Sequence, residues 1–311
     1  MPIDVRDAQA VYKDAGESVI FQTLLLKRED QVQELAAVQD LAANMQSVIN
    51  SMNVRYPDGR LSVTFGFSAP AWTYLFPEAP RPQELEEFTT IEGPKYTAPA
   101  TGGDLFFHVR AHNEAITYEV MDQFSSFIQA ATTVLDETHG FRYFEGRAII
   151  GFVDGTENPA AVEGADYALI GDEDPKFING SYAFAQKYIH NMEAWKALKT
   201  EEQEKAIGRR KYSDLELADD EKAENAHNVV AQDNENDVEH KIVRMNVPYS
   251  DQGVTGTYFI GYAREWAITK RMLTSMFTKS DRLLDFSTPI TGALFFIPSK
   301  TVLDQIAEDA L

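Results

Sequence analysis

Apolar and polar positions alternate along the chain with two different periods, which predict both strands and helices. Residues 61–67 place Leu61, Val63, Phe65 and Phe67 at every second position, as expected of a half-buried strand. Residues 30–52 instead carry apolar side chains near helical spacing, which predicts an amphipathic helix. By the same criteria we expect strands at 18–27 and 105–111, a helix at 113–135, and an excursion loop at 77–103.

Part of this pattern recurs at an offset of 152 residues. Phe107 corresponds to Phe259 and Ala111 to Ala263, and the helix start at 115–117 matches 267–269 as Ala-Ile-Thr. A repeat of this length is the size of a domain, which favours duplication over chance.

The order of these elements indicates an α+β fold. Two tandem ferredoxin-like domains, each an antiparallel sheet with helices packed on one face, fit the repeat. We place the boundary near 140–150, so that the domains are 1–145 and 146–311. The charged stretch 199–240 is poor in apolar residues and is expected to be a loop-rich insertion in the second domain.

Composition excludes several classes of function. The 311 residues include no cysteine, which excludes disulfides, thiolate metal sites, iron–sulfur clusters and cysteine nucleophiles. A net charge of −21 argues against a nucleic acid partner and disfavours anionic membranes. No apolar run approaches the length of a membrane span, and the N-terminus lacks a signal pattern, so we expect a cytoplasmic protein.

The stretch from Gly151 to Pro159 is the strongest candidate for chemistry. An apolar run at 148–150 ends in a loop with glycines around one acid, Asp154. A carboxylate at the end of a buried run is costly unless it has a task or a partner. Asp154 could therefore act as a general acid and base, if burial raises its pKa toward neutrality. The alternative is an acid that only caps its own turn.

A second candidate is the pair Arg244 and Asn246. If 242–248 is a strand, these two side chains share one face, while their apolar neighbours point the other way. A fixed guanidinium on that face could stabilise developing negative charge. The alternative is a strand edge that faces solvent.

These segments together resemble the signature of the dye-decolorizing peroxidases, in particular the bacterial branch with short loops. The matching segments cover nearly the whole chain and occur in the family's order: Gly146-Arg147, 151–159, Ile207-Gly208-Arg209, His227, Arg244-Met245-Asn246 and 281–286. The resemblance implies the ferredoxin-like duplication and a heme b cofactor. Because cysteine is absent, a thiolate cannot be the axial ligand of that heme.

The resemblance also implies a role for individual residues. It makes Asp154 the distal acid and base, Arg244 the distal arginine and Asn246 their supporting neighbour. Gly155, Thr156 and Glu157 would belong to the heme-binding loop, and Arg209 would pair with a heme propionate. For Arg209, a solvated basic cluster with Arg210 and Lys211 is the alternative.

His227 is the iron ligand that the resemblance implies. The chain has six histidines (His108, His112, His139, His190, His227 and His240), and residue chemistry alone does not choose among them. A proximal histidine usually donates its other ring nitrogen to a carboxylate. We expect Asp285, or less favourably Asp281, to be that acid. For both, a carboxylate that only starts or flanks a helix is the alternative.

The implied function is a heme peroxidase that reduces hydrogen peroxide and oxidises small organic reductants, such as dyes and phenolics, in one-electron steps. A heme-binding protein for iron release or heme transport is the second hypothesis, since a carrier needs no distal acid and arginine. A duplicated structural module without cofactor is the third. We also expect a homo-oligomer, although no motif fixes its size or identifies the physiological reductant.

Overall fold

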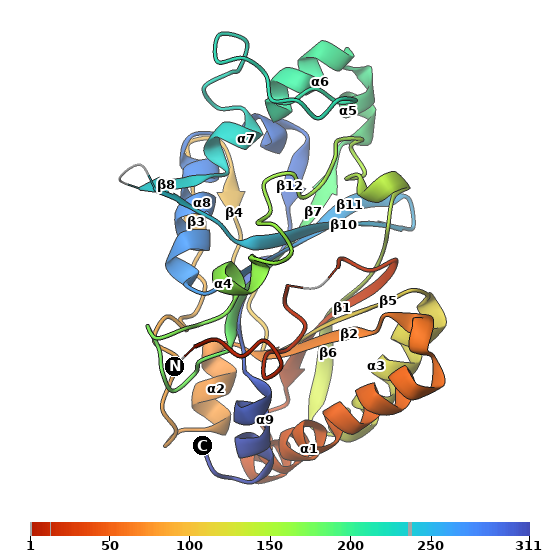
Figure 1. Ribbon diagram of the computed structural model, residues 1–311, viewed down its shortest axis with the longest axis vertical. Coiled ribbons are helices and arrows are strands. Elements are labelled where there is room, and N and C mark those ends of the chain that lie inside the picture. Colours follow the sequence, from red (N-terminus) through yellow and green to blue (C-terminus); the bar gives the residue numbers. More distant parts are fainter. Residues whose placement is uncertain (1, 13, 236–237) are drawn as a thin grey trace.

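The computed structural model describes residues 2–12, 14–235 and 238–311. Its first half carries four long strands and two long helices, with a short helix and two short strands between the second and third long strands (Figure 1). The elements are β1 (Ser18–Leu26), α1 (Gln31–Arg55), β2 (Ser62–Phe67), α2 (Ala69–Leu75), β3 (Ile91–Glu92), β4 (Thr97–Ala98), β5 (Leu105–Ala111), α3 (Glu114–Ile128) and β6 (Thr132–Phe141).

The second half repeats the long strands and the helix that follows the third of them, but it has no counterpart of the long helix α1. Its elements are α4 (Gly164–Ala168), β7 (Ser181–His190), α5 (Met192–Ala197), α6 (Thr200–Ile207), α7 (His227–Val230), β8 (Asp233–Glu235), β9 (Val238–His240), β10 (Val243–Asp251), β11 (Val254–Ala263), α8 (Trp266–Thr278), β12 (Ser287–Pro289), β13 (Ala293–Ile297) and α9 (Lys300–Ala307). Three single 3₁₀ turns, η1 (Pro57–Gly59), η2 (Phe144–Gly146) and η3 (Arg282–Asp285), complete the list.

The strands of both halves join into one closed barrel. Within the described residues, the order is β11-β10-β6-β1-β5-β2-β13-β7, and β7 pairs back onto β11. The halves meet where Tyr249 pairs with Gly140 and where Phe296 pairs with Phe67. The fold is therefore a mixed α and β structure in which the sheet closes on itself.

Alternation along the strands divides the apolar side chains between two cores. Inward-facing residues of both halves, including Phe21, Phe106, Tyr258 and Phe295, fill the barrel. Outward-facing residues of the first half pack under α1 and α3. This follows from the period of two in a strand, which sends successive side chains to opposite faces.

Most elements expected from the sequence are present. The helix expected at 30–52 is α1, which begins after Asp30, whose carboxylate accepts hydrogen bonds from the first-turn amides of Val32 and Gln33. The prediction of a helix at 113–135 is wrong at its C-terminal end, because α3 ends at Ile128 and β6 begins at Thr132. The β-branched run Thr132-Thr133-Val134 explains that change of structure. Among the described residues, every helix is too short or too polar to cross a bilayer.

Candidate active site

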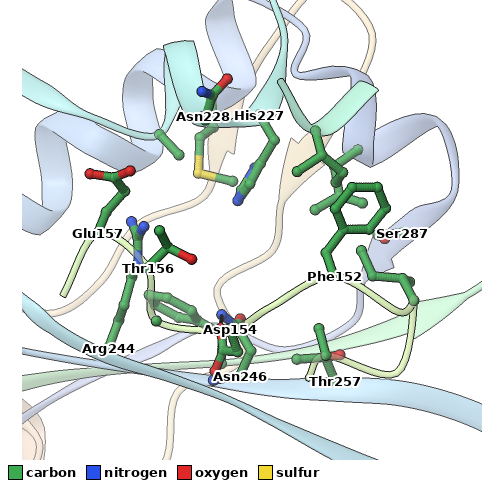
Figure 2. A pocket seen from close by; sticks show the side chains of 18 of the residues that line it. Phe152, Asp154, Thr156, Glu157, His227, Asn228, Arg244, Asn246, Thr257 and Ser287 are labelled. Carbon is green, nitrogen blue, oxygen red and sulfur yellow. Dashed lines mark hydrogen bonds between the residues drawn. The ribbon is translucent and has the colours of Figure 1, made fainter. Parts of the chain in front are cut away.

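One cavity lies in the second half, on the outer side of the barrel wall. Strands β7, β10 and β11 form its floor, and α7, α8 and η3 form its roof. Figure 2 shows His227 reaching down from the roof, while Arg244 and Asn246 rise from the floor and Asp154 lies on the loop beside Asn246. The walls between them are mainly apolar and include Phe152, Ile242, Phe259, Met272, Leu283 and Leu284. The cavity thus has polar groups on two opposite faces and an apolar perimeter.

Asp154 is fixed by two hydrogen bonds from one residue. Its Oδ2 accepts from the backbone N–H of Asn246 at 3.0 Å, and its Oδ1 accepts from the Asn246 side-chain amide at 2.6 Å. Burial raises the pKa of Asp154, and the Asn246 hydrogen bonds and the charge of Arg244 offset this only in part. The carboxylate is therefore oriented, and its pKa lies above that of an ordinary aspartate.

Arg244 and Asn246 share one face of β10, as the alternation predicts. Their neighbours Val243, Met245 and Val247 point into the barrel core. The Arg244 side chain rises beside Asp154 toward Glu157 (Figure 2). Burial lowers the pKa of Arg244, and the nearby charges of Asp154 and Glu157 oppose that effect. The guanidinium thus lies in a partly dehydrated site, where its charge acts more strongly than in water.

His227 lies at the first position of α7 and contacts a buried carboxylate. Its Nδ1 is 2.7 Å from Oδ2 of Asp281, whose side chain is fully buried. A carboxylate only accepts, so Nδ1 carries the proton and donates it. The lone pair of Nε2 is then left to face the cavity, which is the arrangement that a metal ligand requires.

The expectation that Asp285 is the carboxylate partner of His227 is wrong. Asp281 precedes η3 and lies beneath α7, whereas Asp285 ends η3 and faces the first half of the chain. There it accepts hydrogen bonds from Lys95 and Tyr96. Burial acts to raise the pKa of Asp285, but these two hydrogen bonds outweigh it and the net shift is downward.

Arg209 lies at one end of the cavity and is already paired with acids. Its Nη1 donates to Glu157 at 2.6 Å, and its Nε donates to Asp214 at 3.1 Å. Thr156 donates to the same Asp214 at 2.8 Å. Gly155 and these loop residues line the cavity together. The structure therefore places Arg209, Gly155, Thr156 and Glu157 at one edge of the cavity. A heme propionate that bound Arg209 would compete with the carboxylates of Glu157 and Asp214.

Two groups in and around the cavity were not singled out from the sequence. His190 bridges two hydroxyls, with Nδ1 at 2.8 Å from Ser287 and Nε2 at 2.7 Å from Thr257. Burial lowers the pKa of His190 to about 4, so it is neutral near neutral pH. Asn158, next to the cavity loop, bonds the backbone of Arg244. No sequence signal separates His190 from the other histidines, whereas Asn158 belongs to the glycine-rich stretch already noted.

The donor set suits a flat, largely apolar group with a metal at its centre. One imidazole, that of His227, faces the cavity from the roof, and apolar side chains surround the space below it. Among the described residues, no cluster of three or more His, Asp or Glu could hold a bare metal ion. A metal here would therefore need further ligands from its own organic frame.

Comparison with known proteins agrees with this arrangement. The model of the Dyp-type peroxidase C-terminal domain matches residues 145–302, and the model of the N-terminal domain matches residues 8–142. The chain belongs to the Dyp-type peroxidase family. The sequence resemblance to the dye-decolorizing peroxidases is thus confirmed over almost the whole chain.

Individual relatives are similar over comparable lengths. A dye-decolorizing peroxidase of Mycolicibacterium paratuberculosis is 44% identical over 280 residues, which are 87% of this chain and 78% of that protein. The crystal structure of a dye-decolorizing peroxidase from Bacteroides thetaiotaomicron has a TM-score of 0.92 at 49% identity, covering 96% of this chain and 98% of that one. A variant of DypB from Rhodococcus jostii, solved in complex with heme, has a TM-score of 0.91 at 42% identity, covering 96% of this chain and 98% of that one.

Proposed function

We propose that this protein is a heme-dependent peroxidase that reduces hydrogen peroxide and oxidises small organic reductants by one-electron steps. The observation that carries the proposal is a cavity in which His227, backed by a buried carboxylate, faces Asp154, Arg244 and Asn246. Family membership supports the same reaction class.

Heme b is the cofactor that fits these residues. His227 would hold the iron through Nε2, with Asp281 fixing its tautomer and raising its basicity. Gly155, Thr156 and Glu157 would lie along the edge of the group, and Arg209 would approach a propionate. The bound heme supplies the two-electron reduction of the peroxide O–O bond and the later one-electron oxidations, while the protein sets ligand, protonation and access.

The floor residues would move the proton and stabilise charge. Asp154 would take a proton from one peroxide oxygen and return it to the oxygen that leaves as water. Its raised pKa makes the carboxylate a stronger base for the first half of that transfer, and the hydrogen bond from Asn246 holds the carboxylate in place. Arg244 would stabilise the negative charge that develops on the departing oxygen.

A heme-handling protein without peroxide turnover is not favoured. A carrier would need His227 and the apolar walls, but it would not need an acid with a raised pKa beside the guanidinium of Arg244. A module without cofactor is disfavoured by the family match.

We further propose that the halves, 1–145 and 146–311, are two ferredoxin-like domains. In support, each half arranges its four long strands in the order fourth, first, third, second. The order is β6-β1-β5-β2 in the first half and β13-β7-β11-β10 in the second. The cytoplasmic location and the homo-oligomer stay predictions from the sequence.

Stopped-flow absorbance of the heme-reconstituted protein mixed with hydrogen peroxide tests the reaction. We expect rapid conversion of the Soret band in the wild type, slowed about 100-fold or more in Arg244→Leu or in Asp154→Ala. A heme-loaded wild type that ignores peroxide would favour the carrier. Equal rates in all three proteins would show that neither Asp154 nor Arg244 takes part in the reaction with peroxide.

A further inference from the structure

Strand β10 carries two site residues but lacks a strand partner beside them on one edge. Its pairing with β11 runs along its whole length, from Val243 to Asp251. On the other edge, β6 pairs with it only at Tyr249, far from Arg244. Unpaired backbone groups at such an edge are costly when buried, so the structure must satisfy them in another way.

Side chains of the 154–158 loop replace the missing strand. The carboxylate of Asp154 accepts from the backbone N–H of Asn246 at 3.0 Å. Two residues earlier on β10, the backbone N–H of Arg244 donates to Oδ1 of Asn158 at 3.0 Å, and Nδ2 of Asn158 donates to the Arg244 carbonyl at 2.8 Å. The amide of Asn158 thus imitates the backbone of a neighbouring strand.

The backbone conformation of the loop at Gly155 leaves room for the side-chain amide of Asn158. Gly155 has a φ of +74°, and a Cβ at this position would lie 3.0 Å from Nδ2 of Asn158. A side chain at 155 would therefore be strained and would press on the amide. Only a carboxamide offers the donor and the acceptor together at this reach, since an aspartate of the same shape cannot donate.

We infer that Asn158 is a positioning residue that fixes the backbone of Arg244, and that it acts on the reaction with peroxide through Arg244. This inference rests on the proposed function. A guanidinium lies at the end of a long side chain, so its position in the cavity depends on how firmly the backbone of that residue is held. A misplacement of about 1 Å far from the chemistry can cost on the order of 100-fold in rate.

The test is a double-mutant cycle on the heme-loaded protein. It compares the wild type, Asn158→Ala, Arg244→Leu and the double variant by the second-order rate with hydrogen peroxide. Asn158→Asp, which keeps the shape and the acceptor, replaces Asn158→Ala if the latter does not retain heme. Asn113→Ala is the matched control, because Asn113 also bonds a backbone amide, that of Ile116, but in the first half of the chain.

We expect Asn158→Ala to slow the reaction about 10-fold to 100-fold in the wild-type background and less than about twofold in the Arg244→Leu background. Asn113→Ala should leave the rate unchanged. The acid limb of the rate against pH should also move to higher pH, because a displaced Arg244 no longer lowers the pKa of Asp154. An equal loss in both backgrounds, or no loss, would overturn the inference.

Two readouts do not depend on turnover. Fluoride should bind the ferric wild type more tightly than Asn158→Ala, since a fixed guanidinium stabilises a bound anion. Hydrogen exchange of the Arg244 amide should be faster in the variant, which lacks the acceptor Oδ1. If the wild type holds heme but ignores peroxide, the proposed function fails. The inference is then judged on these two readouts, where a change supports it and no change overturns it.

Discussion

The two halves of the molecule share a strand layout but differ in what covers it. In the first half, the connection from β1 to β2 is α1, which packs directly on the sheet with Val38, Leu41 and Met45 fully or nearly buried. In the second half, the corresponding connection from β7 to β10 spans residues 191–242 and passes above the sheet as α5, α6 and α7 (Figure 1). One connection fills the space over its sheet, and the other encloses a cavity.

This difference indicates how one of two halves with the same strand order gains a site. The barrel strands supply rigid positions for Arg244 and Asn246, while the long connection supplies His227 from the opposite side. The polar residues lie where the packed helix is missing, and apolar side chains that would otherwise meet a helix line the cavity instead. Function is thereby confined to the half whose connection departs from the sheet.

The largest expected contrast is in the cost of truncating an apolar side chain in each half. Leu41→Ala should lower the free energy of unfolding by about 2–5 kcal/mol, because Leu41 lies on the buried face of α1 and is fully buried. Met272→Ala should cost less than about half as much in the heme-free protein, since Met272 borders the cavity and loses fewer contacts. Urea unfolding measures both. Equal losses would mean that the cavity wall is packed as tightly as the α1 interface.

A second prediction concerns His190, which lines the cavity, and the dependence of the free energy of unfolding on pH. The pKa of His190 is about 4 in the folded protein, below the roughly 6.5 of an unfolded chain. The folded protein therefore favours the neutral form of His190, and protonation of this residue stabilises the unfolded chain. Its contribution is complete above about pH 6.5 and is lost as the pH falls toward 4.

Between pH 7 and pH 5, the free energy of unfolding of the wild type should fall by about 2 kcal/mol more than that of His190→Gln. Gln can keep one hydroxyl contact but does not titrate. Urea unfolding of the heme-free proteins at the two pH values gives the comparison. Parallel losses in the two proteins would show that other groups control the acid sensitivity.

A smaller effect on heme retention is expected to distinguish Asp281, which precedes η3, from Asp285, which ends it. Asp281→Asn should weaken heme retention about 10-fold, because the proton and orientation of His227 depend on the buried carboxylate. Asp285→Asn should change it less than about twofold, since that group is partly exposed and pairs with Lys95 at the surface. The rate of heme transfer to an excess of apomyoglobin measures both variants. The reverse order would restore Asp285 as the partner of His227.

The sequence predicted the elements and the strand faces better than the contacts between distant segments. Alternation correctly placed Arg244 and Asn246 on one face, because a strand has a fixed period. It did not distinguish Asp281 from Asp285, since tertiary packing decides whether the acid before η3 or the acid at its end faces α7. The role of Asn158 was equally hidden, because its partner lies 86 residues away along the chain.

The measurement that tests the account most directly is a titration of the heme-free protein with heme, in the wild type and in His227→Gly. We predict one heme per chain with a Soret spectrum of histidine-bound iron, lost in the variant and restored by added imidazole, which can occupy the space of the missing side chain. A variant that gives the wild-type spectrum without imidazole would contradict the account, because another residue would then hold the iron and the cavity over β10 and β11 would not be the site.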